Sequence, residues 1–383
     1  MPIRLSSRRL RHTLCTAALG AVLASLGGCA SSGDSTIGYY WQSMRGHLSL
    51  MGAARPLQDW IDDPHAQPAL RERLELAQRA REFAIQELGL PDNASYRRYA
   101  QLGRAAAVWN VVAAPPYSLQ LHTWCFPVTG CIGYRGYFAE ADAQAEAARL
   151  AATGLEVSTY PVPAYSTLGY SNWMGGDPLL NTFIGWPEGD FVRLLFHELA
   201  HQVVYASGDT AFNESYATTV ERIGVAQWLS THSTPKAQAE FSASESRRAQ
   251  FRALTQTTRV RLAELYAAKP NDLSAQKAQA MQAFRDEYAE LRQAWLAEGT
   301  TPARLANLDT WIAQANNAAF GAQGAYDDLV PAFTALFDKE GRDWPAFHAA
   351  VKALADKPRN ERHAALQNLL APQQQADAVA DTR

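Results

Sequence analysis

Apolar positions recur every three or four residues over much of the chain, which is the period of a helix with one buried face. This pattern predicts helices over residues 68–88, ended by Gly89-Leu90-Pro91, and over 139–153, ended by Gly154. Shorter apolar runs rich in β-branched or aromatic residues predict strands. The predicted strands are 108–112, 120–124 and 155–160. The first half of the chain is therefore expected to contain a short α/β region.

From Thr234 onward the sequence is rich in Ala, Gln, Arg and Glu, which favour helix. Residues 236–268 and 273–298, separated by Pro270-Asn271-Asp272, predict a long helical hairpin whose charged positions form a solvated face. Further helices are predicted over residues 302–317, 323–338 and 344–355. The expected fold class is α+β and mostly α-helical, with a small mixed sheet and a C-terminal helical bundle.

An aromatic-rich stripe at helical spacing lies near the start of the chain. It is expected to belong to the core, with contact to a membrane as the alternative. Its members are Ile37, Tyr40, Trp41, Met44, Leu48 and Met51.

The first residues have the composition of a lipoprotein signal. Four arginines between Arg4 and Arg11 precede an apolar stretch over residues 13–25, and Leu26-Gly27-Gly28-Cys29 follows. A transmembrane helix is the alternative, but the apolar stretch has about fifteen residues and a span needs about twenty. Cys29 is therefore expected to carry lipid. Ala30 behind it favours an outer-membrane anchor facing the periplasm, if the host is a Gram-negative bacterium.

Two cysteines remain once Cys15 leaves with the signal and Cys29 is lipidated. Cys125 and Cys131 are six residues apart in a chain that is expected to reach an oxidising compartment, so we expect a disulfide between them. Zinc binding by the pair is the alternative, although no histidine pair follows nearby at the spacing of a zinc finger.

Composition narrows the classes of partner. The chain has 383 residues, a formal net charge of −3 and 47% hydrophobic residues, so it is expected to fold. It contains no basic tract, and nucleic acid is not an expected partner. Attachment to a membrane would depend on the lipid at Cys29.

The sequence His197-Glu198-Leu199-Ala200-His201 has the most specific chemistry in the chain. It lies in an apolar run, residues 194–205, that predicts a buried helix. Residues four apart share one helix face, so both imidazoles are placed to bind one zinc ion. Glu198 is close enough to polarise a water molecule on that ion, and the pattern predicts metal-assisted hydrolysis of an amide bond.

A catalytic zinc ion needs a third protein ligand. Asp209 follows a Ser-Gly pair and is expected to cap a helix, which Asn213 is also placed to cap. Glu214 and Glu221 are seven residues apart and fall on nearly the same helix face. We expect Glu214 to be the ligand and Glu221 to support a ligand histidine; the reverse assignment and a surface role for Glu221 stay open.

These motifs resemble a known family. The sequence HELAH, followed by a helix with Asn213-Glu214-Ser215-Tyr216-Ala217, resembles the gluzincin metallopeptidases. More narrowly, the chain is similar to the bacterial "predicted aminopeptidase" lipoproteins. The blocks that resemble this family are Trp124–Pro127 with Gly130-Cys131, Tyr134–Phe138, Thr167–Tyr170, Asp177–Leu180, His197–Tyr205, Phe212–Thr218 and Asp328–Phe333.

The resemblance implies zinc dependence, peptidase activity and catalytic helices of the zincin type. It implies that His197, His201 and Glu214 are zinc ligands and that Glu198 is the catalytic acid–base. The sequence differs from the familiar gluzincin aminopeptidases in two ways that bear on aminopeptidase activity. Only twelve residues separate His201 from Glu214, and the Gly-x-Met-Glu-Asn motif of the familiar gluzincin aminopeptidases is missing.

A second electrophile usually stabilises the oxyanion in such enzymes. Tyr326 is our first candidate, with Tyr216 and Tyr165 as alternatives, and each has a packing role as its competing explanation. Residues 160–165 or 166–170 are candidates for an edge strand that pairs with the substrate backbone, or for a connecting loop. Asn316-Asn317 is expected either to bind substrate or to end a helix.

Three functions are compatible with these residues. The first is a zinc peptidase of the cell envelope, acting on peptides and most simply an aminopeptidase. The alternatives are a non-catalytic lipoprotein that binds peptides, and a zinc amidase or endopeptidase acting on other envelope peptides. The expected organisation is a signal peptide (1–28), an anchor and tether (29–36), N-terminal helices with the catalytic core (37–232), a helical bundle (233–370) and a disordered tail (371–383).

Overall fold

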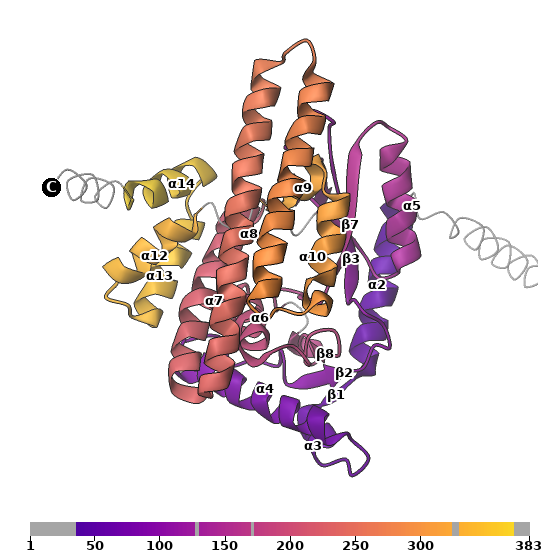
Figure 1. The fold of residues 1–383 in the computed structure, drawn as a ribbon. Helices are drawn as coiled ribbons and strands as arrows, with labels where there is room; N and C mark the ends of the chain where they lie inside the picture. Colours follow the sequence, from indigo (N-terminus) through magenta and orange to yellow (C-terminus); the bar gives the residue numbers. More distant parts are fainter. Residues whose placement is uncertain (1–35, 127–129, 170–171, 324–328, 371–383) are drawn as a thin grey trace, which may run out of the picture. The chain divides into compact units, whose positions relative to one another are not determined.

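The structure is a computed structural model that describes residues 36–126, 130–169, 172–323 and 329–370 (Figure 1). The chain divides into two compact units, Met1–Ser49 and Leu50–Arg383. Helix α2, Thr36–Ala53, belongs mostly to the first unit, and every other element belongs to the second. In the described part of the chain, no helix is both long and apolar enough to cross a membrane.

Helices dominate the second unit, and the expected α+β, mostly α-helical class is confirmed. They are α3 (Leu57–Ile61), α4 (Pro68–Gln86), α5 (Glu140–Ala151), α6 (Glu188–Ala200), α7 (Thr210–His232), α8 (Pro235–Ala268), α9 (Leu273–Ala297), α10 (Pro302–Gln314), α11 (Asn317–Gln323), α12 (Val330–Lys339), α13 (Trp344–Ala355) and α14 (Arg359–Asn368), with a 3-10 turn at Asn172–Met174.

The strands are short and form three small sheets. They are β1 (Ala54–Pro56), β2 (Arg98–Ala100), β3 (Val108–Ala114), β4 (Trp124–Phe126), β5 (Gly130–Ile132), β6 (Arg135–Tyr137), β7 (Glu156–Val162) and β8 (Leu179–Leu180). The sheet β1-β2-β8 is mixed, since β2 is antiparallel to β1 and parallel to β8. The sheet β6-β3-β7 is antiparallel with β7 at one edge, and β4 and β5 form a separate hairpin.

The predicted helical hairpin is present as α8 and α9, which lie side by side and are linked at Lys269–Asp272 (Figure 1). This hairpin has its own apolar core, built around Phe284, Trp295 and Phe320. A larger core joins α4, α6, α7, α12 and α13. The predicted domain boundary at 232/233 stays a prediction, because both segments belong to the second unit.

Three sequence-based expectations are wrong. The strand predicted over 120–124 begins only at Trp124, and a break at Ala315-Asn316 divides the helix predicted over 302–317. The break has a physical cause: the Asn316 amide donates to the carbonyl of Val157 at 2.8 Å and its oxygen caps the next helix at Ala319. The N-terminal stripe is buried at Met51, but Tyr40, Trp41, Met44 and Leu48 are 44–56% exposed.

A buried arginine holds the loop that leads from α4 to β2. Arg81 is 3% exposed and donates to the carbonyls of Ser95, Asn93 and Pro91 at 2.7, 2.7 and 3.1 Å. The Asn93 amide in turn donates to Gln202 at 2.7 Å, one residue after His201. The loop therefore connects the interior of α4 to the end of the histidine-bearing helix.

We expect Arg81→Leu to lower the free energy of unfolding by about 3 kcal/mol, because it leaves three carbonyls without their donor. Urea denaturation followed by circular dichroism measures this change. Arg79→Leu is the matched control, since Arg79 is exposed on the same helix, and should change the stability by less than about 0.5 kcal/mol. Equal effects of the two variants would contradict the role of Arg81.

Candidate metal centre and its cavity

The two helices α6 and α7 pack closely against each other. Gly224 of α7 permits this approach, because a Cβ there would lie 3.0 Å from the ring of Phe196 on α6 and 2.7 Å from Leu88. Asp209 begins α7 by accepting from the amide of Phe212, as expected of a cap. Asn213 does not cap the helix; its side chain instead binds the backbone of Ala206 at 2.7 and 2.8 Å.

Three side chains from these helices converge on one point. The Nε2 atoms of His197 and His201 are 3.1 Å apart, and Glu214 Oε2 lies 3.3 Å from the first and 3.6 Å from the second. These three residues form a possible metal site. His201 follows the last residue of α6 but keeps a helical conformation, so its imidazole stays on the same face as that of His197.

The donor set and its spacing fit a zinc ion. Ligand atoms about 2.1 Å from a tetrahedral zinc ion lie about 3.4 Å apart, close to the three distances between these side chains. Two imidazoles and one carboxylate are a known donor set of catalytic zinc, which leaves a further coordination position for substrate or water. The interior position of the cluster also fits, since His197 is 9% and His201 is 7% exposed.

A second carboxylate contacts the other side of His197. Glu221 Oε2 lies 2.9 Å from Nδ1 of His197, an ion-pair distance, although the ring N–H does not aim directly at it. Glu221 Oε1 lies 3.4 Å from Nε of Arg193, one turn before His197 on α6. Glu214 therefore contacts Nε2 of His197 and Glu221 contacts Nδ1, and the assignment of ligand and supporting residue stays a prediction.

Electrostatics separate the carboxylates. Burial opposes ionisation of Glu214, yet His201 and His197 overcome it and hold the pKa of Glu214 well below its usual range. Burial likewise opposes ionisation of Glu221, but Arg193 and the contact with His197 lower the pKa of Glu221. For Glu198, burial dominates over the nearby histidines and raises the pKa of its carboxyl.

A cavity of about 880 Å³ opens beside the cluster. His197 and Glu198 line it, together with residues 160–164, which belong to the first of the two candidate edge segments. Residues 160–162 belong to β7, an edge strand. The carbonyl of Val157 points to α11 rather than β3, so by alternation the backbone groups of Thr159 and Pro161 also face away from β3.

The tyrosines proposed to stabilise the oxyanion and the asparagines proposed to bind substrate lie in different parts of the fold. Tyr326 lies outside the described residues. Tyr216 is buried, with its hydroxyl 2.8 Å from Nδ1 of His348, and Tyr165 packs against Phe138. Asn316 and Asn317 both bind backbone groups of the protein. The packing explanation therefore holds for Tyr216, and the asparagine pair lies at the break between α10 and α11, as the helix-ending alternative expects.

Three other tyrosines lie near the carboxylates of the cluster. Burial raises the pKa of Tyr96, Tyr134 and Tyr160, and the negative charge of Glu198, Glu214 or both contributes in each case. Of the three, Tyr160 lines the cavity. Sequence reasoning gave none of the three a role in the site: no local pattern marks Tyr96, Tyr134 appeared only within a family block, and Tyr160 only within a candidate edge segment.

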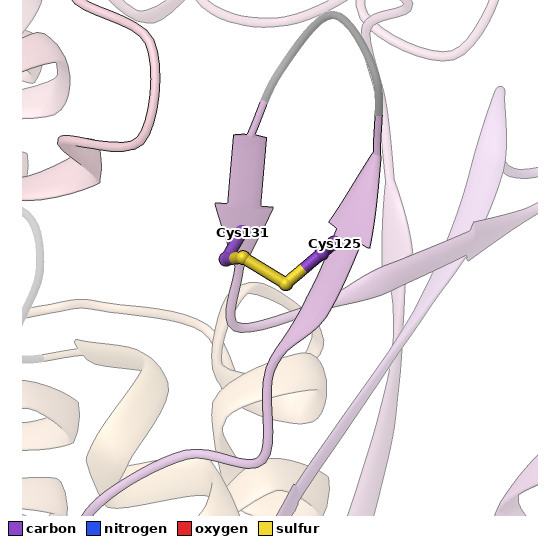
Figure 2. The surroundings of a disulfide bond; sticks show 2 residues. All are labelled: Cys125 and Cys131. Atoms are coloured by element: carbon purple, nitrogen blue, oxygen red, sulfur yellow. A yellow bond between two sulfur atoms is a disulfide. The ribbon is translucent and has the colours of Figure 1, made fainter.

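The hairpin of β4 and β5 contains the disulfide between Cys125 and Cys131 (Figure 2). The two residues face each other across the ladder, with a Cα–Cα distance of 3.9 Å. A Cβ added at Gly130 would lie 3.0 Å from the amide nitrogen of Gly208, so the hairpin reaches the connection between α6 and α7. Cys29 lies outside the described residues.

Comparison with known proteins places the chain in a family. Residues 38–366 match the family model described as "Putative aminopeptidase". Neither the curated proteins nor the solved structures gave a match. Since the family match covers far more than half of the chain, this protein belongs to the "Putative aminopeptidase" family, which supports a peptidase at the level of enzyme class.

Proposed function

We propose that this protein is a zinc-dependent peptidase of the cell envelope, and that it removes residues from the free amino end of peptides. The observation that supports it most directly is the convergence of His197, His201 and Glu214, with His197 and the adjacent Glu198 lining a large cavity. The family description agrees with the enzyme class. The non-catalytic alternative is less favoured, because such a site leaves Glu198 with no function.

The roles of the ligands follow from their positions. His197, His201 and Glu214 would hold the zinc ion, and Glu221 would orient His197 from behind. When bound, zinc supplies a Lewis acid that polarises a carbonyl and lowers the pKa of water toward neutrality. Buried Glu221 also keeps the positive charge of Arg193 close to the ligand shell.

Glu198 would transfer protons. It follows the ligand His197 and lines the same cavity, so a water molecule beside the cluster lies within its reach. Its carboxylate would accept a proton from that water as the oxygen attacks the scissile carbonyl. It would then donate the proton to the leaving amine, which regenerates the carboxylate. Tyr160, in the same cavity, would be available to the developing oxyanion.

The edge of β7 would hold the substrate backbone. Pro161 has no N–H, so at this position the outward edge offers only a carbonyl, which accepts a hydrogen bond from a substrate N–H.

The proposed location depends on the N-terminal sequence. Residues 1–28 would be removed as a signal and Cys29 would carry lipid, anchoring the protein in the outer membrane with its body in the periplasm. A disulfide between Cys125 and Cys131 is compatible with that oxidising compartment.

We expect Glu198→Gln to reduce kcat on peptides by about 10²- to 10⁴-fold while zinc stays bound, because the substitution removes proton transfer and no ligand. The full chain, loaded with zinc in detergent, is incubated with peptides that have free or acetylated amino ends, and products are identified by mass spectrometry. Loss of single residues from free peptides alone is the aminopeptidase result.

The matched control for this experiment is Glu264→Gln, an exposed position on α8, which should cleave like the wild type. Internal cleavage of acetylated peptides would replace the aminopeptidase proposal with an endopeptidase. Full activity of the Glu198→Gln variant would refute the mechanism.

We expect Glu221→Gln to weaken zinc affinity by roughly 10- to 100-fold, because it removes the partner of a ligand. Glu214→Gln should weaken it further, because it removes a ligand. Competition with a chromophoric chelator measures both affinities. A larger loss of zinc affinity for Glu221→Gln than for Glu214→Gln would make Glu221 the ligand and Glu214 the supporting residue.

A further inference from the structure

One side of the cavity is formed by α8, far in sequence from the metal cluster. Four residues of α8 that line it occupy positions i, i+3, i+4 and i+7, which share one helix face: Arg252, Thr255, Gln256 and Arg259. From Arg252 to Arg259 this face extends about 10 Å, the length of roughly three residues of extended peptide. The face is long enough to lie along a bound peptide.

The charged residues that line the cavity are mostly positive. Four arginines line it, against the two carboxylates of Glu198 and Glu221. Arg193 already contacts Glu221 at 3.4 Å and Glu245 at 2.8 Å. Arg222 and Arg252 also have interactions within the protein, and the fourth arginine is Arg259.

Arg259 differs from the arginines that pair within the protein. Its Nη1 donates to Gln256 Oε1 at 3.1 Å, and its Nε is buried without an acceptor. Among the residues that the structure describes, no carboxylate pairs with it. Arg261, two residues later, instead pairs with Glu287 on α9 at 3.1 Å. A buried guanidinium N–H without an acceptor is unfavourable unless a ligand supplies one.

The same cavity also contains an acceptor without a donor. Oε1 of Gln323, on α11, is buried and has no hydrogen-bond partner among the described residues. The cavity therefore presents a guanidinium that needs an anionic acceptor and an amide oxygen that needs an N–H. A peptide with a carboxylate supplies both groups.

We propose that this cavity selects peptides with a carboxylate near the cleaved bond, and that Arg259 binds this carboxylate through its guanidinium. The proposal rests on the proposed peptidase function and names its substrate class. The planar guanidinium matches a carboxylate with two parallel hydrogen bonds, which a neutral side chain does not offer. The carboxylate belongs either to the carboxyl end of a short peptide or to an Asp or Glu side chain.

Binding is measured by calorimetry on the zinc-loaded full chain with Glu198→Gln, so that no peptide is cleaved. Three tetrapeptides of otherwise identical neutral sequence are compared: one with a free carboxyl end, one amidated, and one amidated with a Glu side chain. We expect a carboxylate peptide to bind about 10- to 100-fold more tightly than the neutral amide. The first and third peptides distinguish the two sources of the carboxylate.

Adding Arg259→Gln should abolish this preference and leave the affinity for the neutral amide within about twofold. Arg259→Lys should retain part of the preference for carboxylate peptides, because lysine keeps the positive charge but lacks the two parallel N–H donors of the guanidinium. Arg261→Gln is the matched control on the same helix and should keep the full preference. Three outcomes would overturn the proposal. They are equal affinity for all three peptides, an equal loss of affinity for all three with Arg259→Gln, and no binding of any peptide.

The wild-type enzyme separates this proposal from the proposed function. Cleavage of peptides without any carboxylate preference would leave the peptidase function intact and refute the role of Arg259. Arg259-dependent binding without cleavage by the wild type would refute the peptidase function and retain the binding site.

Discussion

The guanidinium of Arg193 joins three helices, two of which carry the residues of the possible metal site. It extends from α6 and contacts Glu221 on α7 and Glu245 on α8. Glu221 in turn contacts His197, so one chain of alternating charges runs from α8 to a proposed zinc ligand. Removing one member would leave a partner charged and poorly solvated, which is costly in the interior of a protein. The position of the cluster and the shape of the cavity therefore depend on the same buried ion pairs.

Much of the cluster could be predicted from sequence because helical periodicity determines it. The spacing of His197 and His201 fixes their common face, and the seven-residue spacing of Glu214 and Glu221 does the same on the next helix. The helical hairpin could be predicted for a similar reason, since Pro270 and the polar residues after it interrupt two long helical patterns. Sequence patterns were sufficient to predict a feature wherever that feature depends on a single helix or on the turn between two helices.

The remaining features depend on packing between distant segments. Arg259 enters the cavity only because α8 lies against it, and nothing in the sequence near Arg259 distinguishes it from Arg261. Strands of two or three residues, such as β2 and β8, are too short for an alternating pattern to reveal. The break before α11 arises from Asn316 reaching β7, a contact between residues 159 positions apart.

Pro161 in β7 and Pro163 just after the strand have a consequence beyond the substrate. An open edge strand beside an accessible cavity is also able to pair with the same strand of a second molecule, which is how many sheet proteins aggregate. Pro161 lacks the amide that such pairing needs, and the carbonyl of Pro163 already accepts from Thr182. A ladder to another copy would lack a donor at Pro161, whereas a peptide that brings its own N–H groups needs only acceptors from this edge. Pro161 therefore interrupts the row of amide donors along this edge, while its own carbonyl remains on the outward side.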